Sequence, residues 1–81
     1  MILNKTELKN KILYRSSYRG SKEMDILLIS FVKSIINSLN ENDLRLLDVL
    51  VNIDDENLLK LNNNLKTFII IKENKITKLF R

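Results

Sequence analysis

Apolar residues recur every three or four positions through the middle of this chain, and the period predicts an amphipathic helix from residue 24 to residue 39. The residues on its apolar face are Met24, Leu27, Leu28, Phe31, Val32, Ile35 and Leu39. Further isoleucines widen the stripe at Ile26, Ile29 and Ile36. We therefore expect this helix to contact neighbouring helices on more than one side.

A first helix is predicted before it. Asn4 followed by Glu7 fits a capping box, and the apolar spacing continues from there through about Tyr18. Gly20 is the only glycine in the chain. A glycine in the left-handed conformation commonly ends a helix, so we expect Gly20 to cap the first helix and allow the second to begin at Ser21.

Two further helices are indicated by their first residues. Asn40, with an acidic residue three positions later, begins a helix over residues 41–52, because a side-chain oxygen at this position accepts from backbone N–H groups of the first turn. Asp54, with Asn57 three positions later, likewise begins a short helix over residues 55–61. The asparagines at 62–64 then indicate a loop.

The tail has a mixed pattern. The β-branched run within residues 67–71 is typical of a strand, yet a helical face is formed by Leu65, Phe68, Ile69, Ile76, Leu79 and Phe80. We favour a helix, because a lone strand would have no partner. With no proline and no visible second domain, residues 1–81 are predicted to form a compact, single-domain all-α array of four to five short helices.

Composition removes several classes of function. The chain contains no cysteine and no histidine, so it lacks thiolate nucleophiles, imidazole bases, disulfides and the usual zinc ligands. An enzyme is therefore disfavoured. Its apolar runs are far shorter than the roughly 20 residues that span a bilayer. The first residues also lack the apolar stretch of a secretory signal, so we expect a cytoplasmic protein of a bacterium.

Charge is divided along the chain in three blocks. Residues 1–22 and 60–81 each carry six Lys or Arg and one Glu, whereas residues 23–59 carry two Lys or Arg and eight Asp or Glu. One interpretation is that the basic ends fold against the acidic middle and neutralise it in part. The other is a polarised surface that attracts a partner.

The sequence around the glycine, YRSSYRGSKEMD, carries the most specific signal. With the apolar helix, the SLNENDL turn and the acidic DDEN segment that follow, it resembles the SdhE-type FAD assembly factors of succinate dehydrogenase. The R-G-x-x-E motif of that family is matched by Arg19, Gly20 and Glu23, with Asp25 two positions later. The resemblance is strongest over residues 8–61 and weaker over the tail, residues 62–81.

This resemblance implies a small helical protein that is not an enzyme. Members bind the flavoprotein subunit of succinate dehydrogenase, or of fumarate reductase, and promote its self-catalysed covalent attachment of FAD to a histidine. The flavin belongs to the partner, and this chain would hold no cofactor stably. We expect a monomer or weak dimer, with no nucleic acid bound and no membrane insertion.

The resemblance also implies roles for the motif residues. Arg19 would offer its two-pronged guanidinium to a partner carboxylate or carbonyl, and Glu23 would accept from a partner cation or amide, with Asp25 extending the acidic edge. Gly20, having no side chain, would let the partner's backbone approach closely. The alternative for Arg19 and Glu23 is a local ion pair with each other.

Residues on the preceding helix belong to the same candidate surface. Arg15 lies one turn before Arg19, so the two cations are expected to stand together. Tyr14 and Tyr18 lie four residues apart and share a helix face. For these tyrosines, packing at the edge of the core and contact with a partner are both open.

Two other functions compete with this interpretation. The helices at 24–39 and 41–52 have the order of a helix-turn-helix, but the second carries Asp43 and Asp48 against a single Arg45, which disfavours a nucleic-acid phosphate backbone. A generic protein-interaction module, such as an antitoxin-like partner-binding protein, is the remaining alternative. In that case the motif would be only a helix corner.

Overall fold

The chain folds into α-helices joined by short connections. The computed structural model describes residues 4–17 and 19–81, and within these residues it contains five α-helices, one 3-10 turn and no strand. The elements are α1 (Lys5–Ser16), α2 (Lys22–Ile35), η1 (Ile36–Ser38), α3 (Glu41–Val51), α4 (Asp55–Asn62) and α5 (Lys75–Phe80). This confirms the predicted all-α array of four to five short helices.

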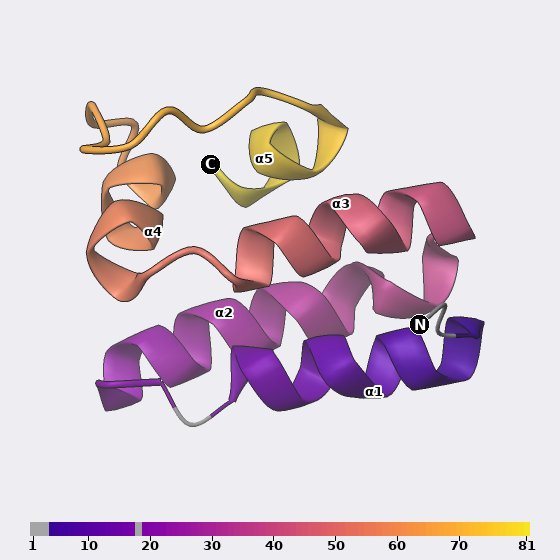
Figure 1. Ribbon diagram of the computed structural model, residues 1–81. Helices are drawn as coiled ribbons and strands as arrows, with labels where there is room; N and C mark the ends of the chain where they lie inside the picture. The colour runs from indigo at the N-terminus through magenta and orange to yellow at the C-terminus, as the bar shows by residue number, and fades with distance from the viewer. Residues whose placement is uncertain (1–3, 18) are drawn as a thin grey trace.

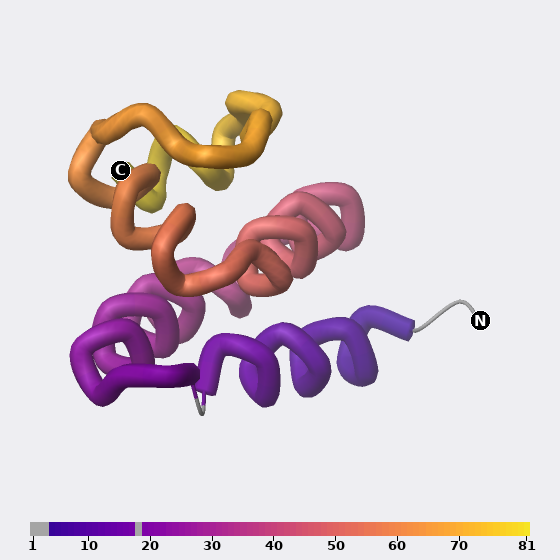
Figure 2. The backbone as a smooth tube through the Cα atoms, turned by 60° about the vertical axis from the view of Figure 1, so that its left-hand side comes forward, coloured from indigo at the N-terminus to yellow at the C-terminus, as the bar shows by residue number. Residues whose placement is uncertain are grey.

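The first three α-helices form the larger part of the molecule. α1 packs against both α2 and α3, while α5 packs against α3 and α4, so that α4 and α5 lie together on one side (Figures 1 and 2). The principal extents of 33 × 26 × 24 Å confirm a compact globule. No helix in the described part of the chain combines the length and the apolar character needed to cross a membrane.

Each of the first four α-helices begins at a polar residue whose side chain accepts a hydrogen bond. Asn4, Ser21, Asn40 and Asp54 accept from the backbone N–H three residues later, at 2.8, 3.2, 2.8 and 3.2 Å. These contacts satisfy backbone donors that have no partner inside the helix. The predicted beginnings of all four helices are confirmed.

The core is a single apolar cluster to which every α-helix contributes. The face predicted for α2 is buried at Met24, Leu28 and Val32. Phe31 of α2 meets Phe80 of α5 edge to face, with ring centroids 5.1 Å apart. The buried residues are Leu8, Ile12, Met24, Leu28, Val32, Ile36, Leu39, Leu44, Leu47, Leu50, Val51, Leu58, Leu61, Ile76 and Phe80.

The end of α1 differs from the prediction. The helix ends at Ser16, and Ser17 is already extended, with φ of −100° and ψ of 167°. The hydroxyls of Ser16 and Ser17 donate to the carbonyl of Leu13, at 2.9 and 3.0 Å, and so satisfy the helix end in place of a glycine. Gly20 does not adopt the left-handed conformation, so the prediction of a glycine C-cap is wrong.

The tail also differs from the prediction, because only its last part is helical. Residues 65–74 form an irregular segment, which we call the tail loop, and α5 begins after it. Asn74 Oδ1 accepts from the backbone N–H of Ile76 and Thr77, at 2.9 and 3.0 Å, while Thr77 Oγ1 accepts from the Asn74 N–H. This capping box begins a new helix and interrupts the helical period that runs through the tail.

The basic ends of the chain do pair with its acidic middle. In the described residues, three ion pairs join the charge blocks, and each carboxylate comes from the acidic block. They are Lys11–Asp48 at 3.1 Å, Arg19–Asp55 at 2.7 Å and Lys75–Asp43 at 2.9 Å. Partial neutralisation within the fold is therefore confirmed for these pairs.

Candidate partner-binding site

The R-G-x-x-E motif lies where the chain turns from α1 into α2. We call residues 19–25 the motif corner. The ends of α1 and α3 and the beginnings of α2 and α4 all face this side of the molecule, at the left in Figure 1. The motif corner is therefore in reach of four helix termini, each of which carries unpaired backbone groups.

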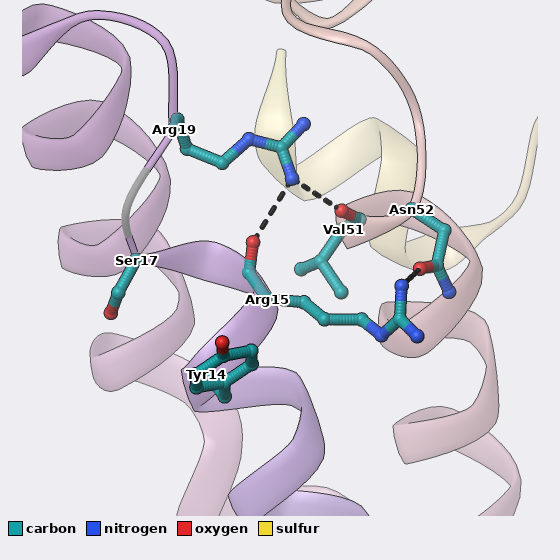
Figure 3. A pocket seen from close by; sticks show the side chains of 6 residues that line it. All are labelled: Tyr14, Arg15, Ser17, Arg19, Val51 and Asn52. Atoms are coloured by element: carbon teal, nitrogen blue, oxygen red, sulfur yellow. Dashed lines mark hydrogen bonds between the residues drawn. The ribbon is translucent and has the colours of Figure 1, made fainter.

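Arg19 contacts three of these neighbouring elements through its guanidinium group. Nη1 donates to the carbonyls of Arg15 at 3.0 Å and Val51 at 2.7 Å, two contacts drawn in Figure 3. Nη2 donates to the carbonyl of Ile53 at 2.5 Å, and Nε donates to Asp55 Oδ1 at 2.7 Å. Only 14% of the side chain is exposed, so this cation is largely enclosed by its own chain.

Helix dipoles explain why a cation is stable at this point. The Arg15 carbonyl belongs to the last turn of α1, and Val51 is the last residue of α3. Carbonyl groups at a helix C-terminus carry partial negative charge, which a guanidinium group neutralises. Asp55, in the first turn of α4, is in turn stabilised by the positive end of that helix. Arg19 thus joins two helix ends to one helix beginning.

The structure gives Arg19 contacts that the sequence did not indicate. In the described residues the local ion pair with Glu23 does not form, and the carboxylate partner is Asp55 instead. The guanidinium also faces the chain's own acceptors, whereas the sequence suggested that it points toward a partner. Asp55 was missed as a site residue because it lies 36 positions from Arg19, and its DDEN segment indicated only a helix beginning. Direct partner contact by Arg19 stays a prediction.

Gly20 is exposed and is approached closely by Asp55. Its backbone N–H donates to Asp55 Oδ2 at 3.1 Å. A Cβ atom on Gly20 would lie 3.3 Å from that same oxygen, which is tighter than ordinary van der Waals contact. The close approach that favours glycine at this position is therefore made, in the free chain, by Asp55.

The two acidic residues of the motif corner have different environments. Asp25 is half-buried, and its Oδ1 accepts from the backbone N–H of Arg19, so it holds the corner from the α2 side. The side chain of Glu23 is exposed and makes no hydrogen bond or ion pair with the described part of the chain. Glu23 is consequently the acidic group of the motif that a partner can reach.

An open cleft of about 320 Å³ lies next to the motif corner, between the ends of α1 and α3 (Figure 3). Arg15 and Arg19 both line it. Arg15 is exposed and its Nη1 donates to Asn52 Oδ1 at 2.7 Å. Tyr14 is 73% exposed, so the packing alternative is wrong for this ring. Tyr18, also expected at the site, lies outside the described residues.

Comparison with known proteins decides the family. Residues 10–81 match the family model described as "Flavinator of succinate dehydrogenase". The chain belongs to this family. The match includes the whole motif corner, Asp55 and the tail, so it continues past residue 61, where the strongest part of the resemblance ended.

A curated relative supports the same assignment. The chain is 37% identical over 57 residues to the protein named "Succinate dehydrogenase assembly factor 2, mitochondrial" from Arabidopsis thaliana. The aligned part makes up 70% of this chain and 30% of that relative, so the chain spans less than a third of the relative's length. No solved structure matches the chain.

Proposed function

We propose that this chain is an assembly factor that binds the flavoprotein subunit of succinate dehydrogenase and promotes the covalent attachment of FAD to it. The family match over residues 10–81 carries this proposal, because it includes a motif corner whose Gly20 and Glu23 are exposed. The flavoprotein of fumarate reductase is a second partner of the same kind. The location in a bacterial cytoplasm also stays a proposal, since the name of the Arabidopsis relative places that protein in mitochondria.

The chain's own contribution is binding and orientation. It contains no histidine, so the reacting histidine is supplied by the partner, and the family resemblance implies that the flavin belongs to the partner as well. Glu23 supplies a carboxylate that accepts from a partner cation or amide. Holding the partner's flavin domain in a reactive orientation increases the rate by proximity, because fewer arrangements must be sampled before the histidine attacks.

Arg15 and Tyr14 extend the proposed contact surface along α1. Both side chains are exposed and line the cleft beside the motif corner. An exposed guanidinium next to an aromatic ring offers hydrogen bonds and apolar contact area together, a combination that is enriched in protein interfaces. The surface that meets the partner therefore includes the last turn of α1 as well as the motif corner.

Co-expression tests this function. A succinate dehydrogenase flavoprotein subunit that is poorly flavinylated when expressed alone would be produced with and without this chain, in a host that lacks its own assembly factor. Covalent flavin would be measured by fluorescence in a denaturing gel. We expect a strong signal only with the chain present, a reduced signal with Glu23→Ala, and full signal with Glu56→Ala. Glu56 is an exposed acidic residue of α4 and serves as the matched control. Equal fluorescence with and without the chain would reject the proposed function.

A further inference from the structure

Both carboxylate oxygens of Asp55 bind the motif corner. Oδ1 accepts from Arg19 Nε at 2.7 Å, and Oδ2 accepts from the Gly20 N–H at 3.1 Å. Asp55 reaches these groups from the first turn of α4, across 36 and 35 positions of sequence. A single side chain thus fixes two consecutive residues of the motif.

We propose that Asp55 is a positioning residue for partner binding. It holds Arg19 and Gly20 in one arrangement, and thereby presents Glu23 and the exposed backbone of the motif corner to the flavoprotein in a single orientation. This inference rests on the proposed function and adds a residue from outside the motif to it. Preorganised contacts bind more tightly, because less conformational entropy is lost when the partner docks.

The geometry requires a carboxylate at position 55. The side chain must accept two hydrogen bonds at once, one on each oxygen. An asparagine side chain has a single acceptor oxygen, and its amide group would face one of the two donors. Asp55→Asn therefore keeps the shape of the side chain and its place in α4 but can satisfy only Arg19 Nε or the Gly20 N–H.

The position of Asp55 indicates a local role in the corner more than a role in the stability of the domain. Its side chain is 32% exposed, whereas the neighbouring core residue Leu58 is fully buried. If the carboxylate is removed, the Arg19 guanidinium still has three carbonyl acceptors, on Arg15, Val51 and Ile53. Removing the carboxylate should release the motif corner and leave the helices folded.

Binding measurements with matched variants test this inference. The affinity of the flavoprotein subunit for the full chain would be measured by calorimetry, at a temperature where circular dichroism shows each variant folded. We expect Asp55→Asn to weaken binding by about tenfold. Two controls should stay within about twofold: Glu56→Gln, which removes the adjacent charge, and Asp43→Asn, which removes the ion pair with Lys75 between α3 and α5.

A spectroscopic measurement on the free chain separates positioning from stability. In ¹⁵N NMR spectra, Asp55→Asn should shift the Gly20 amide and Arg19 Nε–H signals and speed the exchange with water of the one donor that loses its acceptor. Asp43→Asn should leave both signals in place. Unchanged Gly20 and Arg19 signals in Asp55→Asn would overturn the inference.

The outcomes distinguish this inference from the proposed function. If the unmodified chain does not bind the flavoprotein, the proposed function fails, and the inference fails with it. If the unmodified chain binds and Asp55→Asn binds equally well, only the positioning role is overturned. An Asp55→Asn chain that is unfolded by circular dichroism would make Asp55 a residue of the fold, which also overturns the positioning role.

Discussion

The motif corner, which includes the first turn of α2, and the tail loop both connect helices, yet they are held in opposite ways. In the motif corner, the backbone N–H of Arg19 donates to a carboxylate of α2. Its guanidinium donates to a carboxylate of α4 and to backbone carbonyls of α1 and α3. In the tail loop, Phe68 and Ile70 are 72% and 100% exposed. Its links to the rest of the chain include one hydrogen bond from the Phe68 N–H to Asn57 and the ammonium of Lys60 over the Phe68 ring.

The difference teaches that a polar motif and an apolar run place different demands on the fold. Each polar contact of the motif corner requires a particular donor and acceptor, so a substitution leaves an unpaired group. The exposed apolar side chains of the tail loop contact little, so most replacements should be tolerated. Four predictions test this contrast.

The largest effect is expected where the tail loop ends and the core begins. Ile76, in α5, is fully buried, whereas Ile70 of the tail loop is fully exposed. Ile76→Ala should lower the free energy of unfolding by about 3 kcal/mol through lost apolar contacts and a cavity. Ile70→Ala should change it by less than about 0.5 kcal/mol. Urea unfolding followed by circular dichroism measures both, and similar losses would show that the tail loop is packed.

The second-largest difference in stability is expected between Arg19, a cation of the motif corner, and Lys60, a cation that contacts the tail loop. Arg19→Ala removes four side-chain hydrogen bonds and should lower the free energy of unfolding by about 2 kcal/mol. Lys60→Ala, which removes the cation over Phe68, should cost about 0.5 kcal/mol. Arg19→Lys should recover little, since an ammonium group cannot reproduce the planar guanidinium contacts. An Arg19→Ala chain as stable as the Lys60→Ala chain would contradict this prediction.

A smaller effect is expected at Gly20. Gly20→Ala places a Cβ atom against Asp55 Oδ2, so it should lower the free energy of unfolding by about 0.5 to 1 kcal/mol. The same substitution in an Asp55→Ala background should cost less, because the opposing oxygen is gone. Denaturant unfolding of the two single variants and the double variant measures this coupling. Strictly additive costs would mean that Asp55 does not explain the glycine.

The smallest effect is a pH dependence of stability that arises from Asp54, the residue that caps the beginning of α4. Hydrogen bonds from the side chain and backbone N–H of Asn57 hold the pKa of the Asp54 carboxyl below its usual value of 3.8. A depressed pKa stabilises the fold above the ordinary pKa, and that stability is lost as the pH falls through the lowered value. Asp54→Asn keeps a helix cap but cannot titrate. The unmodified chain should lose slightly more stability on acidification than Asp54→Asn, as measured by urea midpoints at neutral and acidic pH.

Local signals in the sequence predicted much of this fold. The caps at Asn4, Asn40 and Asp54 act over three residues, so their pattern is visible in the sequence. The Arg19–Asp55 contact joins residues 36 positions apart, and no local pattern reveals it. In the tail, helical spacing and β-branched residues gave conflicting predictions, and the side chain of Asn74 decided where the helix begins.

Only part of the candidate site could be predicted, because some of its contacts are local in sequence and others are not. The motif identified the corner and its exposed groups, Gly20 and Glu23, because both lie within one short segment. The direction of the Arg19 side chain depends on where α3 and α4 end and begin around it. That information exists only in the folded chain, so the sequence did not reveal that Asp55 binds Arg19.

Hydrogen exchange of the free chain and of its complex with the succinate dehydrogenase flavoprotein subunit tests the proposed contact surface most directly. Backbone amides of the motif corner, residues 19–25, and of the last turn of α1 should exchange more slowly in the complex. Amides of the tail loop, residues 65–74, should exchange equally fast in both states. Slower exchange confined to the tail loop, with the motif corner unchanged, would contradict the proposal and place the partner on the apolar segment.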